Sequence, residues 1–386
     1  MRGHIRRRGE NSWELKYDVA GEDGGRRTVY KSFKGAKRQA QAELTRLLAQ
    51  AGEGNHVDPT RLTVGEHVRA RFEHWKLAKI ISPMTAQRYG ELIENNIVPY
   101  LGARQLQRLN TLDIETWHAA LRAHGRKGRT GYADKSEGGL SARTIGHAHR
   151  ILSKALSEAM KHGLIAKNVC TLERAPRIET EEVQILTLEQ VDELPSMLHG
   201  HPLEAPALVS LHTGMRRGEL LALRWGNVDL ENEVIRVRES LEQTRAGLRF
   251  KGPKTKAGRR DITLPAAAVD LLQAHRKREL ERRLMQGQGR LTDGDLVFPA
   301  WNGTPWAPNS FGAAWSKLSS ELELGVSFHA LRHTHASYLL HLNVDPVTIS
   351  KRLGHSSPAV TLSIYAHLIK QDDRKAANAI NAALKG

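Results

Sequence analysis

Residues 329–334 read His-Ala-Leu-Arg-His-Thr, and this stretch gives the strongest indication of what the chain is built for. Its first histidine and its arginine are three residues apart, so a helix would direct both side chains to one side. Further along, residues 353–355 read Leu-Gly-His and are followed by Tyr365. Far upstream, residues 213–216 read Thr-Gly-Met-Arg. These segments together supply arginines, histidines and a tyrosine, which we treat as one candidate site.

This combination of side chains suits chemistry on a phosphodiester. Each guanidinium offers a rigid fork of donors that matches two phosphate oxygens, and it stays charged near neutral pH. Imidazoles can move protons near neutral pH. A tyrosine hydroxyl, with a free pKa of about 10, becomes a usable nucleophile when nearby cations and a base lower the cost of its anion. The candidate site residues are Arg216, His329, Arg332, His355 and Tyr365.

The residues of these segments and their order along the chain resemble the motifs of the tyrosine recombinases, the phage integrase family. The first box of that family, T-G-x-R-x-x-E-L, is matched by residues 213–220. Its H-x-L-R-H-T box is matched by residues 329–334, and its L-G-H box by residues 353–355. The nucleophile of the family corresponds to Tyr365, ten residues beyond the last histidine of that box. The boxes stand in the family's order, which makes the resemblance specific.

The family also places a lysine on a β-hairpin between the first two boxes. Residues 253–260 fit that place, with Lys254 the better match and Lys256 the alternative. Residues 234–238 and 261–264 read as strands, so we expect residues 254–260 to form the turn of a hairpin. The lysine that is not the general acid is expected to contact a DNA phosphate.

Two neighbours of Arg216 can be interpreted by their positions. Glu219 lies three residues further on, on the same helical face, and is expected to hold the guanidinium in place. Arg217 has no box position, and we expect it to be a surface arginine at a helix cap. His333 and His335 are expected to be structural, either packed or hydrogen-bonded.

The resemblance implies a reaction and a role for each residue. Tyr365 would attack the scissile phosphate and give a 3′-phosphotyrosyl link with a free 5′ hydroxyl. Arg216 and Arg332 would balance the charge of the pentacoordinate transition state. His329 would act as base toward the tyrosine, His355 would hydrogen-bond the phosphate, and the lysine would act as general acid. Because the covalent link conserves the bond energy, the resemblance implies no ATP, no metal and no other cofactor.

Composition agrees with a nucleic-acid partner. The chain has 386 residues, a formal net charge of +16 and a pI near 10.0, and clustered Lys and Arg bind polyanions by releasing their counterions. Its single cysteine, Cys170, excludes an internal disulfide and a multi-cysteine metal site. No apolar run approaches the roughly 20 residues that span a bilayer, and the Arg-rich start lacks a secretory signal. We therefore expect no membrane partner and a cytoplasmic, nucleoid-associated protein.

The chain is expected to be multidomain and mainly α, with small antiparallel β-sheets. Residues 1–55 contain two alternating strand patterns and a helical pattern, and they resemble the β-rich arm-type DNA-binding domain of larger integrases. Residues 60–175 are helical and resemble the core-binding domain, although a plain helical bundle would look the same. Residues 186–386 resemble the mixed α/β catalytic domain. The candidate DNA-binding residues of the arm domain are Arg6, Arg7, Arg8, Arg26 and Arg27.

The implied partner is double-stranded DNA carrying attachment sites, on which four protomers would assemble. A directionality factor and a host DNA-bending protein are further partners that the resemblance suggests. The main alternative is a type IB topoisomerase, which shares the chemistry without strand exchange. A DNA-binding repressor would need none of the boxes. A zinc hydrolase fits poorly, because His329 and His333 have zinc-helix spacing but Ala330 stands where the catalytic glutamate would be.

Overall fold

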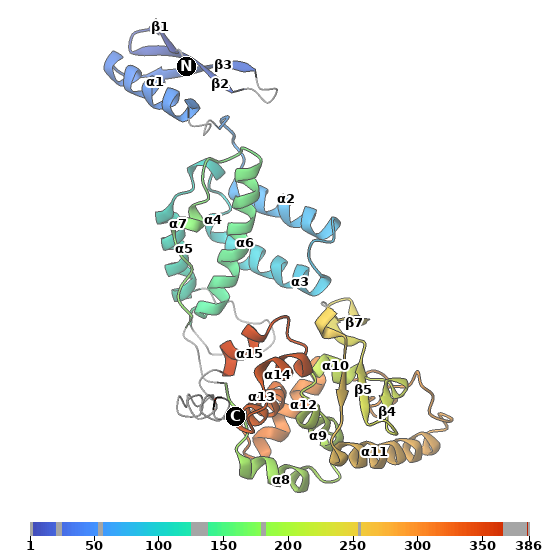
Figure 1. Ribbon diagram of the computed structural model, residues 1–386. Helices are drawn as coiled ribbons and strands as arrows, with labels where there is room; N and C mark the ends of the chain where they lie inside the picture. Colours follow the sequence, from blue (N-terminus) through green and yellow to red (C-terminus); the bar gives the residue numbers. More distant parts are fainter. Residues whose placement is uncertain are drawn as a thin grey trace. The chain divides into compact units, whose positions relative to one another are not determined.

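The structure is a computed structural model that describes residues 3–20, 25–52, 57–124, 138–178, 183–253, 256–365 and 384 (Figure 1). The chain divides into two compact units, Met1–Glu179 and Thr180–Gly386. The first unit has separate hydrophobic cores in its β-rich and helical parts. The second unit has one large core, with a smaller cluster around α13 and α14.

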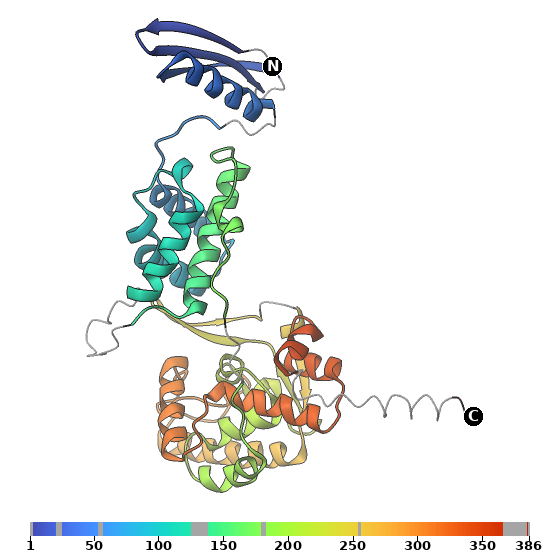
Figure 2. The ribbon, with the colours of Figure 1, turned by 90° about the vertical axis from the view of Figure 1, so that its left-hand side faces the viewer.

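The N-terminal part is a three-stranded antiparallel sheet, in the order β1-β2-β3, with one helix on it. Its elements are β1 (Gly3–Gly9), β2 (Ser12–Ala20), β3 (Arg26–Lys34) and α1 (Lys37–Gly52). Leu15, Tyr17 and Val19 alternate along β2 and point to α1, which lies along one face of the sheet (Figure 2). The sequence pattern predicts β2 and β3, but it does not predict β1.

The following part is a helical bundle. Its helices are α2 (Val64–Leu77), α3 (Pro83–Leu92), α4 (Val98–Leu101), α5 (Thr111–His124), α6 (Ala142–Lys161) and α7 (Val169–Leu172). Residues Ile93–Ile97 form a π-helical turn that joins α3 to α4, so helical structure continues through Pro99 to Leu101 and ends at Gly102. Ile145, Leu152 and Ala155 of α6 are fully buried in this core. Within the described ranges, every helix is too short or too polar to cross a membrane.

The second unit is mainly helical with small sheets. Its helices are α8 (Leu188–Leu198), α9 (Glu204–Thr213), α10 (Arg217–Leu221), α11 (Ala266–Met285), α12 (Pro308–Glu321), α13 (Phe328–His341), α14 (Pro346–Leu353) and α15 (Pro358–Tyr365). Phe311, Trp315 and Phe328 pack edge to face between α12 and α13. This packing fixes the start of α13, where the 329–334 stretch begins.

The strands of the second unit correct the expected hairpin. They are β4 (Val228–Asp229), β5 (Val234–Val237), β6 (Ser240–Thr244), β7 (Gly247–Lys251) and β8 (Arg260–Thr263). β5 and β8 pair antiparallel, but β6 and β7 form a hairpin of their own between them. The segment 252–259 therefore links two sheets, with a 3₁₀ turn at Lys256–Gly258, and is not the tight turn of a β5–β8 hairpin.

Candidate phosphodiester site

Two glycines in the left-handed conformation shape the backbone of the site. Gly214 ends α9 with φ 64°, and Gly354 ends α14 with φ 67°. Each is also tightly enclosed, because a Cβ on Gly214 would lie 2.6 Å from Leu353 and one on Gly354 would lie 2.8 Å from the Ala257 oxygen. Only glycine accepts this conformation without cost and fits the space. The two helix ends can therefore approach each other closely.

Arg332 bridges these two helix ends from α13. Its guanidinium donates from Nη1 to the Gly214 oxygen at 2.6 Å and from Nη2 to the Leu353 oxygen at 2.8 Å. The residue is 2% exposed. The helix carbonyls left free at each end are the natural acceptors for a cation. Arg332 is thus a fixed, buried positive charge between the first and third boxes.

Arg216 is the N-cap residue of α10, and it is held by the carboxylate of Glu219. The Arg216 Nη1 donates to Glu219 Oε1 at 2.8 Å, and its backbone N–H donates to Glu219 Oε2 at 2.9 Å. The Arg216 Nη2 donates to the Gly354 oxygen at 3.1 Å. The Arg216 side chain is 39% exposed, so its guanidinium can still reach a ligand from solvent.

Arg260 completes this arrangement from the first residue of β8. Its Nη1 and Nη2 donate to the two oxygens of Glu219 at 3.2 and 2.9 Å. Its Nε donates to the Arg352 oxygen at 2.6 Å. Burial alone would raise the pKa of Glu219, but Arg260 and Arg216 outweigh it and hold that pKa below its ordinary value.

His355 follows Gly354 directly and faces the arginines. Its Nδ1 is hydrogen-bonded to the Thr361 hydroxyl of α15 at 2.8 Å, and its backbone N–H donates to the Ser350 oxygen. Loss of solvation, followed by the charges of Arg332 and Arg216, lowers the pKa of His355 to about 4. The imidazole is therefore neutral at neutral pH. The Thr361 contact ties α15 to the loop that carries His355.

His329 is the second residue of α13 and lies at the rim of the site, where its side chain is still partly open to solvent. Its ring meets the His333 ring edge to face, with centroids 4.7 Å apart. Loss of solvation, then His333 and Arg332, lower the pKa of His329 to about 4. His329 is therefore a neutral imidazole that can accept a proton.

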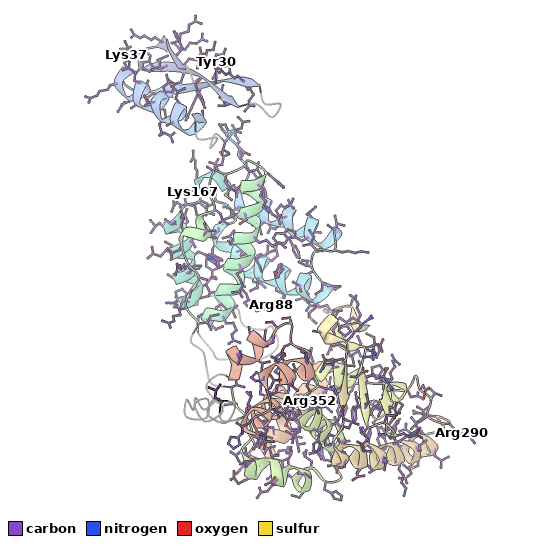
Figure 3. The ribbon with its side chains drawn as sticks, in the orientation of Figure 1. Tyr30, Lys37, Arg88, Lys167, Arg290 and Arg352 are labelled. Atoms are coloured by element: carbon purple, nitrogen blue, oxygen red, sulfur yellow. The ribbon has the colours of Figure 1, made fainter. Side chains whose placement is uncertain are left out.

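His335 has a structural position, as expected. Its Nδ1 donates to the Leu211 oxygen at 2.8 Å, and its Nε2 accepts from Arg352 Nε at 3.1 Å. Arg352 lies on α14 (Figure 3). Its Nη2 also donates to the His212 oxygen at 3.1 Å. These contacts bind α13 and α14 to the end of α9.

Some predicted residues cannot be placed at this site. Lys254 and the side chains of Lys256 and Tyr365 lie outside the described residues. The backbone of Tyr365 is described as the last residue of α15. Among the described residues, no cluster of three or more His, Cys, Asp or Glu is placed to hold a metal ion.

The five candidate arginines of the N-terminal sheet form two separate groups. Arg6, Arg7 and Arg8 lie on β1, whereas Arg26 and Arg27 lie on β3, and β2 separates these edge strands. All five side chains are exposed. Arg8 and Arg27 are paired with Glu14 and Asp58, each at 2.6 Å. The sheet therefore presents two basic edges instead of one continuous basic stripe.

Sequence reasoning missed the roles of Arg260 and Arg352 and misjudged Arg217. Arg260 had a signal, because it alternates with the inward-facing Ile262 and Leu264 at the period of a strand. For Arg352, the sequence offered no signal except that the residue directly precedes the third box. Arg217 was expected to be a surface arginine at a helix cap; it does begin α10, but its side chain is half-buried in the wall of a cavity.

Comparisons with known proteins agree with the boxes. Residues 184–372 match the phage integrase family, and residues 67–122 match the phage integrase N-terminal SAM-like domain. A tyrosine recombinase XerC-like protein of Caldanaerobacter subterraneus subsp. tengcongensis is 27% identical, covering 94% of each chain. A putative prophage phiRv2 integrase of Mycobacterium tuberculosis is 26% identical, covering 97% of this chain and 94% of its own.

Solved structures show the same fold. The Tn1549 transposon integrase, in complex with transposon right-end DNA, aligns with a TM-score of 0.66 at 22% identity, covering 84% of this chain and 100% of its own. A λ integrase tetramer bound to a Holliday junction aligns with a TM-score of 0.53 at 18% identity, covering 92% and 96%.

The two family matches together span more than half of the chain. The two relatives, which are named a recombinase and an integrase, align with nearly the whole length of the chain. These findings do not favour the topoisomerase alternative. The chain therefore belongs to the phage integrase family, and it is a site-specific DNA recombinase of the tyrosine type.

Proposed function

We propose that Tyr365 is the nucleophile with which this recombinase cleaves and rejoins DNA to integrate or excise a mobile element. The observation that carries the proposal is the convergence of Arg216 and Arg332 on the loop of His355, each guanidinium anchored on main-chain carbonyls of the helix ends. Two fixed cations beside neutral imidazoles form a suitable cradle for a phosphodiester that gains negative charge as it reacts.

In the first step, one phosphoester bond of the DNA is exchanged for a bond to the protein. The Tyr365 oxygen attacks the scissile phosphorus, the bond from phosphorus to the 5′ oxygen breaks, and a 3′-phosphotyrosyl link forms. The phenol proton passes to the neutral His329, and the departing 5′ oxygen takes a proton from Lys254, or from Lys256 if that lysine is the general acid. Rejoining is the reverse, with the 5′ hydroxyl of another strand as the nucleophile. Each step breaks one phosphoester bond and forms another, so the reaction needs no external energy source.

Arg216 and Arg332 serve as donors to the non-bridging oxygens, which carry extra charge in the transition state. Glu219 orients Arg216. With the Thr361 hydroxyl as donor to Nδ1 of His355, the Nε2 atom keeps its proton and donates to a phosphate oxygen. The bound phosphate offsets the arginine charges that lower the pKa of His355.

The rest of the assembly follows the same proposal. Residues 1–55 bind flanking arm sites through the basic edges of β1 and β3, and residues 60–175 grip the core site with the catalytic domain, residues 186–386. Four protomers act on two double-stranded attachment sites in the nucleoid. A directionality factor and a host DNA-bending protein bias the direction of the reaction.

The test is covalent trapping on a nicked attachment-site duplex, whose sequence comes from junctions of the integrated element. Tyr365→Phe should bind the duplex nearly as well as the wild type and form no covalent adduct in a denaturing gel. Tyr338→Phe is the matched control, because Tyr338 is a half-buried tyrosine of α13, and it should form adduct normally. An adduct formed by Tyr365→Phe would refute the nucleophile assignment.

A further inference from the structure

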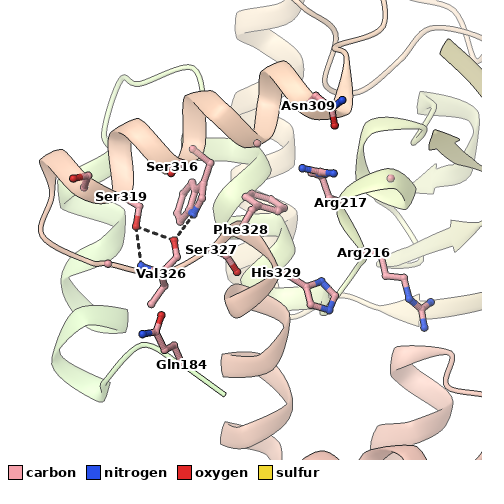
Figure 4. Close-up of a pocket in the computed structure, with 15 residues that line it drawn as sticks. Gln184, Arg216, Arg217, Asn309, Ser316, Ser319, Val326, Ser327, Phe328 and His329 are labelled. Atoms are coloured by element: carbon pink, nitrogen blue, oxygen red, sulfur yellow. Dashed lines mark hydrogen bonds between the residues drawn. The ribbon is translucent and has the colours of Figure 1, made fainter. Parts of the chain in front are cut away.

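A cavity of about 980 Å³ opens beside the candidate phosphodiester site (Figure 4). Arg216 and His329 lie at one end of it, and the rest of the wall comes from the start of α10, from α12, from the start of α13 with the residues just before it, and from Gln184. The box residues therefore occupy only one side of this space. The remaining wall has no role in the reaction described above.

Arg217 is the cation of this remaining wall. It follows Arg216 at the start of α10 and extends toward α12, between Asn309 and Phe328 (Figure 4). Loss of solvation lowers the pKa of the Arg217 guanidinium, although an arginine remains charged at neutral pH. Over the described ranges, no carboxylate forms an ion pair with Arg217 and no aromatic ring stacks on it, whereas its neighbours Arg216 and Arg224 both pair with glutamates.

Gly312 leaves room for the Arg217 guanidinium at the cavity wall. Gly312 of α12 lies directly against it, and a Cβ at that position would be 2.4 Å from Arg217 Nη1. Partial burial of a cation costs free energy unless a negative charge lies nearby. Among the described residues, the Arg217 guanidinium lacks such a counter-charge at this position. An anion in the cavity would supply it.

The other polar groups of the wall agree with an anionic ligand. Hydroxyl and amide groups of Asn309, Ser316 and Ser327 line the cavity, and no Asp or Glu is among its described lining residues. Ser327 is the N-cap of α13 but makes no side-chain capping bond, so its hydroxyl is available. Ser319 is already committed, because it donates to the Val326 oxygen and accepts from the Val326 N–H.

We infer that this cavity is a second phosphate site, in which Arg217 binds a DNA backbone phosphate next to the scissile one. The inference rests on the proposed function, since the scissile phosphate is taken to lie at Arg216 and His329. Successive phosphates of one strand follow the backbone past the site, so a neighbouring phosphate can enter the cavity. Arg217 then fixes the register of the strand but takes no part in bond making.

The first test measures binding of attachment-site duplex as a function of salt, in the Tyr365→Phe background so that the DNA stays intact. Arg217→Ala should weaken binding by roughly tenfold, which is the size of one charge-assisted hydrogen bond. It should also reduce the slope of log affinity against log salt by about 1. Arg290→Ala is the matched control, because Arg290 is exposed on the edge of the same unit, and it should change neither quantity (Figure 3).

The second test removes single backbone charges by methylphosphonate substitution on either side of the cleavage position. At one position next to the scissile phosphate, the neutral linkage should weaken binding by wild-type Arg217 and have no further effect on Arg217→Ala. Gly312→Ala should reproduce the Arg217→Ala defect without changing any charge, because its methyl group displaces the guanidinium. Equal sensitivity of both proteins at every position would overturn the inference.

The outcomes separate this inference from the nucleophile assignment. If Tyr365→Phe abolishes the adduct but Arg217→Ala leaves affinity and salt slope unchanged, only the second phosphate site is wrong. If Arg217→Ala lowers the melting temperature with unchanged binding, Arg217 is a packing residue and the inference fails. An adduct formed by Tyr365→Phe would instead refute the proposed function.

Discussion

Glu219 and Arg260 form a bidentate ion pair in the interior of the catalytic unit, with side chains only 5% and 6% exposed. The same carboxylate also holds Arg216, so one acidic group serves a structural arginine and a candidate catalytic one. Arg260 reaches the third box through the Arg352 oxygen. The position of Arg216 therefore depends on a pair that does not itself contact the site of reaction.

Arg260→Ala should destabilise the catalytic unit by about 3–5 kcal/mol, because it leaves the Glu219 carboxylate buried without its main counter-charge. Cleavage by the fraction that remains folded should also slow, since Arg216 loses the fixed carboxylate that orients it. Chemical denaturation and single-turnover cleavage would measure the two effects. Arg259→Ala is the control, because Arg259 is the exposed neighbour, and it should leave both quantities near wild-type values.

Arg216→Ala and Arg332→Ala should each slow cleavage by roughly 10²–10³-fold, as expected for loss of a transition-state donor. Arg332→Lys should also be impaired, because an ammonium cannot contact the carbonyls of Gly214 and Leu353 with the geometry of a fork. The measurement is single-turnover adduct formation, with DNA affinity measured in parallel. A full rate in Arg332→Lys would show that charge alone is required.

The folded protein should lose stability as the pH falls below about 6.5. Burial, followed by the charge of Arg352, lowers the pKa of His335 to about 3, whereas its unfolded pKa is near 6.5. Between these values the unfolded chain binds a proton that the folded chain excludes, so the loss grows until the pH passes below about 3. Over that range, each fall of one pH unit should remove up to about 1.4 kcal/mol from the free energy of unfolding.

Thermal unfolding from pH 7 to pH 4 would measure this loss. His335→Gln offers a neutral donor and acceptor in place of Nδ1 and Nε2, so its melting temperature should fall less steeply with acid. His341→Gln, at an exposed position of the same helix, should retain the wild-type slope. Parallel slopes for all three proteins would contradict the assignment to His335.

Deletion of residues 1–55 should spare cleavage at the core site but weaken integration on substrates with long flanking DNA. The β-rich part has its own core, so its removal need not disturb the helices that follow. Arg6→Ala with Arg26→Ala should reproduce part of the defect, since these two side chains have no carboxylate partner among the described residues. Equal integration by the truncated and full chains would argue against arm-site binding.

Where local chemistry is distinctive, the sequence predicts the structure well. Thr187 followed three residues later by Gln190 is a capping-box pattern in the sequence, and the two residues form that box at the start of α8. Asp345 and Pro346 are a typical start for a helix and Gly354 a typical end, and in the structure they bound α14. The alternation in β2 also predicts its buried face correctly, because a half-buried strand repeats every two residues.

The missed elements lack such local signals. β1 is composed of glycine, arginine and few apolar residues, so only its pairing with β2 makes it a strand. The β6–β7 hairpin turns at Arg245 and Ala246, which is not a usual turn pair, and most of its side chains are partly exposed. The site shows the same limit, because the bonds of Arg260 to Glu219 and Arg352 join residues far apart in the chain.

The anchoring of Arg216 and Arg332 on main-chain oxygens has a consequence for how this protein can vary. Their acceptors belong to Gly214, Leu353 and Gly354, and a substitution cannot delete a peptide carbonyl. Replacing Leu353 by another apolar residue would therefore leave the acceptor of Arg332 in place. The two glycines are different, because any side chain there would strain the backbone and push the helix ends apart. Apart from His355, whose side chain we assign to the reaction, a deep mutational scan should find position 353 tolerant of other apolar residues, and positions 214 and 354 intolerant of any side chain.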